Sequence, residues 1–245
     1  MLRHNCCYKS FIGPGTIRHS SIKALQSSLH QELTTRPPNR IFDYLSPVPS
    51  HLLNITLSDF LPDSCQPLGF SKTDFELPVI ESSSNKPLPQ GHHLVYFSPQ
   101  VPSSGLLPDG TDYLQSPGSP YDRRMWAGGA LGFNAQPHNK LTVDNGRVCC
   151  TESISNVAVR GVEGDEKIFV TIERRISKVL ITGEIAKQAS DNGATVETIG
   201  QNYLLPSSMI EERNLVYFRQ KAPSSLQELS RTPVKILKRG SHYPQ

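Results

Sequence analysis

The most distinctive chemistry of this chain is concentrated in one stretch, SPYDRRMWAGGALGF, which contains the only tryptophan. Guanidinium groups bind phosphates well, so Arg123 and Arg124 beside Trp126 could hold a phosphate-bearing ligand. Gly128 and Gly129 indicate a place where the backbone comes very close to a ligand or to a packed element. A core tryptophan with ion-paired surface arginines would produce the same pattern. The residue types alone do not separate these two interpretations.

Other side chains that could act as acids, bases or ligands occur in loop-like sequence. His138 has an asparagine four residues upstream that could orient a base, but its position after a proline favours a surface histidine at a bend. His92 and His93 form a pair with no carboxylate partner nearby in the sequence. Asp109 and Asp112 could form an acid–base pair or a cation site, although Asp-Gly in a proline-rich loop favours a simple turn. None of these groups is predicted to be catalytic.

Several common classes of site have no motif in the sequence. There is no GxSxG elbow, P-loop or HExxH helix, and the GGALG run falls short of a dinucleotide fingerprint. The five cysteines lack CxxC spacing, which argues against a zinc site and a thioredoxin-like motif and suits a reducing compartment. A net charge of +3 is too small for a nucleic-acid footprint. No apolar run approaches the roughly 18 residues that a membrane span needs.

The first 38 residues have the composition of a mitochondrial transit peptide. They contain several arginines, lysines and serines but no acidic residue before Glu32, and the membrane potential draws such cationic segments into the matrix. Four apolar residues recur at helical spacing, as the groove of an import receptor would require. These residues are Ile22, Leu25, Leu29 and Leu33. The prediction is a transit peptide or disordered segment over residues 1–38, with a disordered basic tail as the alternative.

Proline density and hydrophobic pattern divide the rest of the chain. Residues 39–120 are predicted to form a short helix at 51–61 and then a long irregular connection, because eight prolines lie from Pro78 to Pro120. Residues 121–222 are predicted to form an antiparallel sheet of roughly four to five strands joined by hairpins. Such a sheet must cover one face with a helix or with a second sheet.

The strand predictions rest on alternation and on turn signals. Asn145-Gly146, between alternating apolar residues, predicts a tight hairpin. The apolar residues of 154–162 end at the turn Glu163-Gly164-Asp165, after which KIFVTIER (167–174) alternates as a half-buried strand. The segment ERNLVYFR (212–219) gives a final strand. The segment VLITGEI (179–185) is predicted to extend or follow the strand at KIFVTIER.

The run from His92 to Phe133, HHLVYFSPQVPSSGLLPDGTDYLQSPGSPYDRRMWAGGALGF, resembles the amino-terminal half of the hydroxyacyl-thioester dehydratase type 2 family. The family pattern of a VYF run followed by LPDGTD, SPG and RRMWAGG is matched throughout. Residues 152–176 and 211–219 resemble the family's next strands. The resemblance extends over roughly residues 40–235. Bacterial relatives of the family include mesaconyl-CoA hydratase and MaoC-like hydratases.

The resemblance implies an α+β hot-dog fold, an antiparallel sheet around a helix, as the first half of a tandem double hot dog. It implies reversible dehydration of an (R)-3-hydroxyacyl thioester of acyl carrier protein or coenzyme A, in fatty-acid synthesis in the mitochondrial matrix. No metal or redox cofactor, no nucleic-acid partner and no membrane span are expected. The expected partner is a second copy of the chain, in a homodimer, or a second hot-dog unit. Five residues would line the acyl or pantetheine route and pack the seam between the two units. They are Arg123, Arg124, Trp126, Gly128 and Gly129.

The family's catalytic signature, an Asn or Asp followed by His and then Asp, belongs to the second hot dog. Residues 223–245 resemble the linker towards that unit, and no such signature follows them. The catalytic half is therefore expected to be missing from this chain. Three interpretations remain open: a dehydratase completed by a second unit, a non-catalytic hot-dog module that binds acyl thioesters or a partner, and a mesaconyl- or itaconyl-type CoA hydratase.

Overall fold

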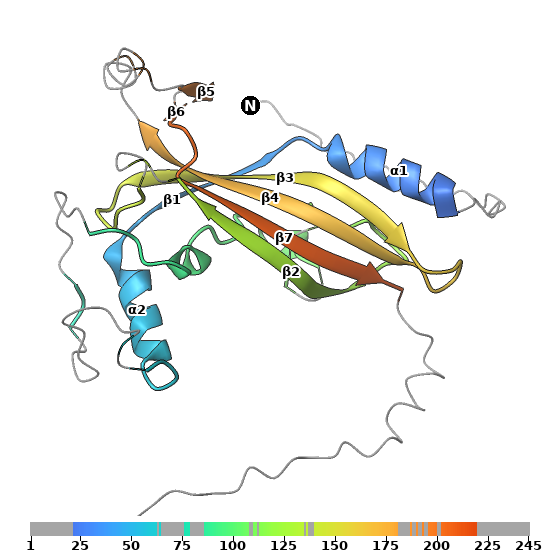
Figure 1. The fold of residues 1–245 in the computed structure, drawn as a ribbon, viewed down its shortest axis with the longest axis horizontal. Helices are drawn as coiled ribbons and strands as arrows, with labels where there is room; N and C mark the ends of the chain where they lie inside the picture. Colours follow the sequence, from blue (N-terminus) through green and yellow to red (C-terminus); the bar gives the residue numbers. More distant parts are fainter. Residues whose placement is uncertain are drawn as a thin grey trace, which may run out of the picture.

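A long antiparallel sheet forms the body of the molecule (Figure 1). In this computed structural model the described residues are 22–62, 64, 76–78, 86–107, 110–111, 113–134, 136, 140–180, 187, 190, 193, 196–199 and 202–219. The five longer strands lie in the order β1-β3-β4-β7-β2, each antiparallel to its neighbour. Their bounds are β1 Asn39–Tyr44, β2 Arg123–Phe133, β3 Arg147–Arg160, β4 Lys167–Leu180 and β7 Met209–Phe218. A small pair, β5 Glu197–Ile199 and β6 Asn202–Leu204, extends the sheet from the end of β4.

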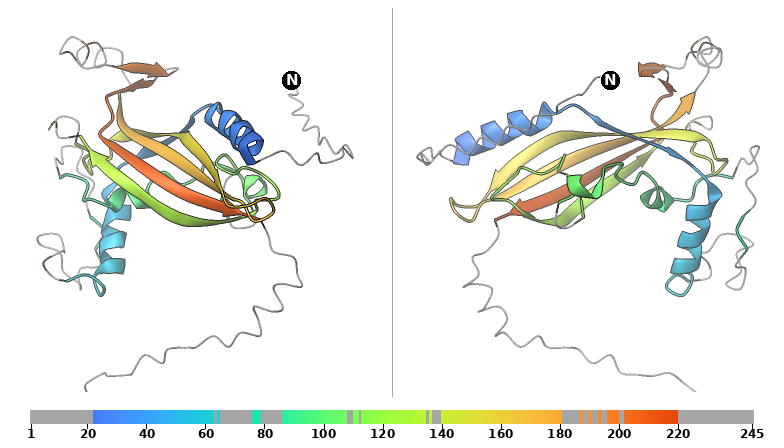
Figure 2. Two further views of the ribbon diagram at one scale, coloured as in Figure 1. Left: turned by 45° about the vertical axis from the view of Figure 1, so that its right-hand side comes forward. Right: turned by 180° about the vertical axis from the view of Figure 1, so that it is seen from behind.

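Helices are few and lie at the two ends of the sheet. Helix α1 (Ile22–Thr34) packs along β3, whereas α2 (Pro47–Leu57) projects from the opposite end (Figures 1 and 2). Helix α2 begins where the side chain of Ser46 accepts a hydrogen bond from the backbone of Val48, with Pro47 in the first turn. Two short 3-10 helices, η2 (His92–Val95) and η3 (Ser103–Gly105), lie in the connection that crosses one face of the sheet (Figure 2).

Alternation along β4 defines the covered face of the sheet. From Ile168 to Ile176 its even-numbered residues are buried, while the odd-numbered residues of that stretch are half-buried or exposed. We call the face that carries Ile168 the inner face. A register shift in β3 between Ile154 and Asn156 keeps successive apolar residues of that strand on the inner face.

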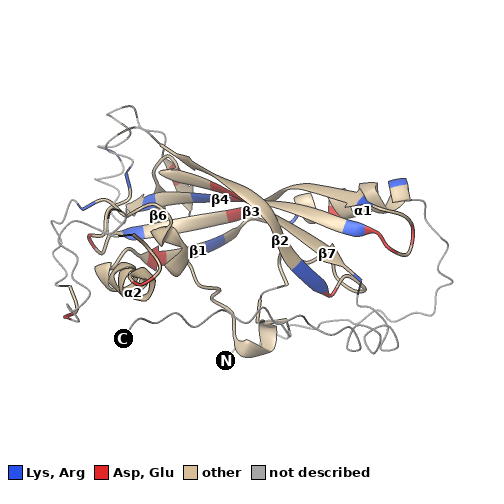
Figure 3. Cartoon of the chain, turned by 60° about the horizontal axis from the view of Figure 1, so that its bottom comes forward, with Lys and Arg blue, Asp and Glu red and all other residues tan. Residues whose placement is uncertain are grey.

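Two apolar clusters cover the inner face, one towards each end. The first joins α1 to the sheet through Leu29, Leu33, Tyr121, Val157, Ile168, Val170, Ile172, Leu215 and Tyr217. The second joins the η2 connection to the sheet through Ile41, Leu45, Tyr96, Phe97, Leu141, Val148, Cys150, Ile176 and Met209. Charged residues also lie within the strands and not only in the loops (Figure 3). The mostly antiparallel sheet with few helices confirms the α+β class expected for a hot dog.

The strand predictions for 154–162, 167–174 and 212–219 are confirmed, and each strand is longer than predicted. The prediction of a hairpin at Asn145-Gly146 is wrong. The turn exists, with Asn145 at φ 61°, but the residues before it do not pair with β3. Its backbone instead pairs with Leu45 at the end of β1, because β1 occupies that edge of β3.

The amino-terminal predictions also differ from the structure. The amphipathic pattern from Ile22 does form a helix, but its apolar face packs in the core, where Leu33 is fully buried. Residues 22–34 are thus part of the fold, whereas residues 1–21 lie outside the described residues. The sheet also includes β1, which precedes the predicted start of the sheet at residue 121. The helix predicted at 51–61 begins earlier, at Pro47, and leaves Phe60 80% exposed.

Candidate functional site

A buried group of charges lies between the two apolar clusters of the inner face. The Arg174 side chain, on β4, donates from Nε to Glu152 Oε1 (2.6 Å) and from Nη1 to Glu211 Oε2 (2.7 Å). The three residues face one another across β3, β4 and β7, as the register of the strands dictates. Arg213 Nε donates to the second oxygen of Glu211 (2.8 Å), and Asn39 Nδ2 donates to Glu152 (3.3 Å). The charges of two arginines and two carboxylates therefore balance.

The surroundings of Glu211 keep it ionised. Burial by itself would raise the pKa of its carboxyl group. The neighbouring His93 imidazole and the hydrogen bonds from Arg213 and Arg174 outweigh burial and lower this pKa to about 2. Glu211 is therefore a carboxylate at neutral pH. It can accept hydrogen bonds or stabilise a positive charge, but it has no proton to donate.

The imidazole of His93 lies beside this carboxylate. His93 is 1% exposed, and its Nε2 lies 3.6 Å from Glu211 Oε2, with no hydrogen-bond partner for Nε2 among the described residues. Two residues earlier in the chain, Gly91 has φ 86°, a conformation that suits glycine, and it starts the η2 turn. The adjacent His92 is fixed by a hydrogen bond between its Nδ1 and Ser50 Oγ (2.5 Å). The structure thus holds His93 at a set position on the inner face.

A cavity of about 570 Å³ opens beside His93 and Glu211. Strand β2 and the η2 connection form its walls, with Leu94, Trp126 and Leu131 as the large apolar residues. Its size lies within the range of small-molecule sites, roughly 300–1,000 Å³, and mostly apolar walls with a few polar groups are typical of them. The cavity can hold an apolar chain whose polar end meets His93 and Glu211.

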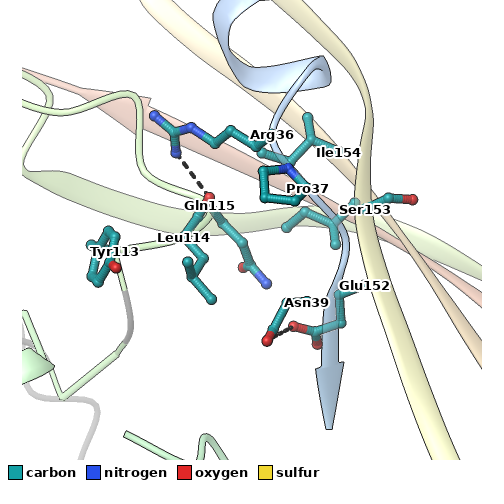
Figure 4. Close-up of a pocket in the computed structure, with 10 residues that line it drawn as sticks. Arg36, Pro37, Asn39, Tyr113, Leu114, Gln115, Glu152, Ser153 and Ile154 are labelled. Atoms are coloured by element: carbon teal, nitrogen blue, oxygen red, sulfur yellow. Dashed lines mark hydrogen bonds between the residues drawn. The ribbon is translucent and has the colours of Figure 1, made fainter. Parts of the chain in front are cut away.

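A second cavity, of about 230 Å³, is lined by Glu152, the other carboxylate of the charged group (Figure 4). Arg36 donates from Nη1 to the backbone carbonyls of Leu114 (2.8 Å) and Ser116 (3.0 Å), which fixes the loop that forms one wall. The hydrogen bond from Asn39 to Glu152 lies at the opposite wall (Figure 4). Because Glu152 lines this cavity and Glu211 lines the larger one, Arg174 connects the two.

The five residues expected to bind substrate all lie on or beside β2, but the structure does not bring all of them to one place. Trp126 and Gly129 line the larger cavity. Arg123 stacks its guanidinium 5.7 Å from the centre of the Phe218 ring, on the opposite face. Gly128 has φ 137° and follows a register shift in the pairing with β7. Arg124 pairs with Tyr217 along the register and is half-buried.

Gly129 allows the close backbone approach that the Gly-Gly pair indicates. A Cβ atom at this position would lie 2.4 Å from the backbone carbonyl oxygen of Glu212 and 3.1 Å from the Trp126 ring. Heavy atoms at the first of these distances overlap, so any larger residue would push β2 away from β7. The glycine therefore keeps the bulged strand against its neighbour and the indole over the cavity.

The sequence did not reveal the buried charged group. His93 does have a carboxylate partner, Glu211, contrary to the expectation from the sequence, because the fold brings together residues far apart in the chain. Only the charges within the apolar alternation of KIFVTIERRI could have indicated Arg174. The other candidates, His138, Asp109 and Asp112, lie outside the described residues.

Two negative findings concern the described part of the chain only. There, no group of three or more His, Cys, Asp or Glu side chains is arranged to hold a metal ion. No helix in the same residues has both the length and the apolar character needed to cross a membrane.

Comparison with known proteins agrees with the motif resemblance. The model of the family described as hydroxyacyl-thioester dehydratase type 2 matches residues 91–238, which is more than half of the chain. A similar curated protein is the mitochondrial hydroxyacyl-thioester dehydratase type 2 of Schizosaccharomyces pombe, 31% identical over 121 residues. The match covers 48% of this chain and 36% of the yeast protein, so the chain spans about a third of that relative's length. By the match to its model, the chain belongs to the hydroxyacyl-thioester dehydratase type 2 family.

Proposed function

We propose that this chain is the first hot-dog unit of an (R)-3-hydroxyacyl-thioester dehydratase of mitochondrial fatty-acid synthesis. The proposed substrate is the thioester of acyl carrier protein or coenzyme A, in the matrix. The observation that carries the proposal is the cavity of about 570 Å³ against the RRMWAGG strand, within the segment that the family model matches. The mitochondrial name of the yeast relative supports the proposed location.

The chemistry of the cavity suits an acyl chain. Burial of each methylene contributes about 0.8 kcal/mol, so a four-carbon acyl group that fills the apolar part gains a few kcal/mol. Leu94, Trp126 and Leu131 supply that apolar surface. In this proposal the unit binds and orients the acyl group, while a second hot dog supplies the catalytic His and Asp that remove the α-proton and handle the hydroxyl.

Strand β2 is the proposed seam with that second unit or with a second copy of the chain. Among the described strands it pairs with β7 alone, so its other edge has no strand neighbour there. Large apolar residues on β2 and β7 are exposed next to this edge: Met125 57%, Trp126 54%, Leu131 48%, Phe133 48% and Ile210 37%. An exposed edge lined by such residues is a site for strand pairing or for an apolar interface.

The second candidate function is a hot-dog module that binds acyl thioesters without turning them over. The ionisation state of Glu211 is compatible with this candidate: a carboxylate with a pKa of about 2 is too weak a base to remove an α-proton near neutral pH, and binding needs no base. Binding in the cavity would then be the function of the chain itself.

Hydration of crotonyl-pantetheine tests the first candidate and calorimetric binding of butyryl-pantetheine tests both. The purified 245-residue chain is compared with the protein isolated from mitochondria. The dehydratase proposal expects binding by both samples and hydration by the mitochondrial protein. Binding without hydration in either sample supports the module, and absence of binding in both overturns the two candidates together.

A further inference from the structure

One wall of the larger cavity is a single turn of 3-10 helix. Gly91, which starts η2, and His93 and Leu94 within it line the cavity. A 3-10 turn has poorer hydrogen-bond geometry than an α-helix and occurs only in short pieces. The bonds from Leu94 N to Gly91 O and from Tyr96 N to His93 O are both 3.2 Å, at the long end of the usual range. The position of this wall therefore depends on the elements to which the turn is attached.

Helix α2 provides the strongest polar attachment of the turn. Ser50 is the one buried residue of α2, and its Oγ lies 2.5 Å from Nδ1 of His92, which is also buried. The hydroxyl of Tyr96, at the end of the turn, donates to the backbone carbonyl of Ser46 (2.5 Å), the residue that caps α2. Both hydrogen bonds thus tie the η2 connection to the beginning of α2.

The sheet attaches the same turn less firmly. His93 Nε2 lies 3.6 Å from Glu211 Oε2, beyond the usual hydrogen-bond range of about 2.7–3.2 Å. The Leu94 side chain is 60% exposed. Among the described residues, the Ser50–His92 hydrogen bond is the one that joins an η2 side chain to another element. Helix α2 packs against η2 and projects from the end of the sheet (Figure 2), so it can hold the turn from outside.

We propose that Ser50 and His92 are positioning residues of the acyl site, and that their hydrogen bond, the α2 latch, keeps the η2 wall of the larger cavity in place. This inference rests on the proposed function, since it takes an acyl thioester as the occupant of the cavity. Neither residue lines the cavity, so both act through the turn that carries Leu94.

Loss of the α2 latch should weaken binding through the population of the wall. Without the Ser50 hydroxyl, Nδ1 of His92 is buried without a partner, which favours arrangements in which the turn moves and this atom reaches water. The apparent dissociation constant is the intrinsic one divided by the fraction of molecules whose wall is in place. One buried hydrogen bond changes an equilibrium constant by roughly tenfold, so binding should weaken by up to about that factor.

Calorimetric titration of the 245-residue chain with butyryl-pantetheine tests the α2 latch. Ser50→Ala and His92→Leu should weaken binding to the same extent, and the double variant should show no further loss, because all three lack the same bond. His92→Asn keeps a hydrogen-bond acceptor and should retain most of the affinity. The matched control is Thr56→Ala, which removes a hydroxyl of the same helix that donates to the Leu52 carbonyl (2.9 Å) at the surface, and it should bind like wild type.

Trp126 supplies a second measurement, which a merely structural role of the α2 latch would not change. It is the only tryptophan of the chain and lines the cavity together with Leu94. If the turn moves away from the cavity, the indole ring loses cover. Acrylamide should therefore quench the emission of ligand-free Ser50→Ala more strongly than that of wild type or Thr56→Ala, with all three proteins folded by far-ultraviolet circular dichroism.

The outcomes separate the α2 latch from the proposed function. If folded Ser50→Ala binds the thioester and is quenched like wild type, the bond is only structural and the latch is overturned, even where urea shows a loss of stability. Equal losses of affinity in Ser50→Ala and Thr56→Ala also overturn it. If the wild-type chain does not bind butyryl-pantetheine, the proposed function fails, and stronger quenching of Ser50→Ala would still support the latch. Where Ser50→Ala does not fold, His92→Leu against His92→Asn makes the same comparison at the other partner.

Discussion

Replacement of Arg174 by Met should destabilise the fold strongly, because it leaves two carboxylates buried without their shared partner. Arg174 is 2% exposed and donates at 2.6 Å to Glu152 and at 2.7 Å to Glu211. After the change, Glu211 keeps Arg213, but Glu152 keeps only the Asn39 amide at 3.3 Å. Removal of one partner of a buried ion pair costs about 3–5 kcal/mol, a large part of the roughly 5–15 kcal/mol that stabilises an ordinary domain.

The assay is urea unfolding followed by far-ultraviolet circular dichroism, with Arg175→Met as the matched control. Arg175 is the next residue of the same strand, but its side chain is 54% exposed and pairs with Glu173 at the surface, so its loss should cost at most about 1 kcal/mol. Equal losses in the two variants, or a loss below about 1 kcal/mol for Arg174→Met, would refute the reasoning that the network is buried and balanced. Simultaneous replacement of Arg174, Glu152 and Glu211 by Met, Gln and Gln should recover much of the stability, because no buried charge of the triad then remains unpaired.

Three further predictions follow from the same structure. The pKa of Glu211 is lowered from an ordinary value of 4.5 to about 2. Its ionisation therefore contributes roughly 3 kcal/mol of stability above pH 4.5, and this contribution is lost as the pH falls towards 2. Urea unfolding of wild type and Glu211→Gln should show a difference in the free energy of unfolding at pH 7 that shrinks at pH 2.5. Leu33→Ala should cost about 2–5 kcal/mol, because the side chain is fully buried, whereas Leu52→Ala, at a half-exposed leucine of α2, should cost far less in the same urea titration. Gly129→Ala should lose about 1–3 kcal/mol in the urea titration, since its Cβ would overlap the backbone carbonyl oxygen of Glu212. Gly132→Ala should unfold close to wild type, because its Cβ would lie 3.9 Å from the nearest atom, the carbonyl oxygen of Ile210.

Local patterns were enough to predict the central strands. The alternation in KIFVTIER and in ERNLVYFR reports directly which side chains face the core, since the period of a strand is two residues. The prediction of a hairpin at Asn145-Gly146 was wrong because a turn signal describes only four residues. It does not specify which strand the flanking residues will pair with. Here β1, about a hundred residues earlier in the chain, takes that position beside β3.

The helix at Ile22–Thr34 shows how one pattern can support two interpretations. An amphipathic helix suits an import receptor and equally suits the open end of a sheet, because both present an apolar surface. Composition favoured the first, and the burial of Leu29 and Leu33 against β3 reveals the second. The boundary predicted at residue 38 therefore falls beyond an element that belongs to the core.

The polar part of the site could not be predicted, because it is assembled from distant strands. His93 and Glu211 are 118 residues apart in the sequence, and only the order β3-β4-β7 brings Glu152, Arg174 and Glu211 into one row. Charged residues within strands look like solvent-facing positions in a sequence. Their burial becomes visible only once the two apolar clusters on either side of them are in place.

Trp126 offers the most direct test of the central claim that the cavity beside β2 binds an acyl thioester. It is the only tryptophan of the chain and it lines that cavity, so its fluorescence reports on the site without a label. Titration of the purified chain with (R)-3-hydroxybutyryl-pantetheine should give a saturable change in the emission of Trp126, and free pantetheine at the same concentrations should give none. An emission spectrum that stays constant up to millimolar thioester, or that responds equally to pantetheine alone, would contradict the claim.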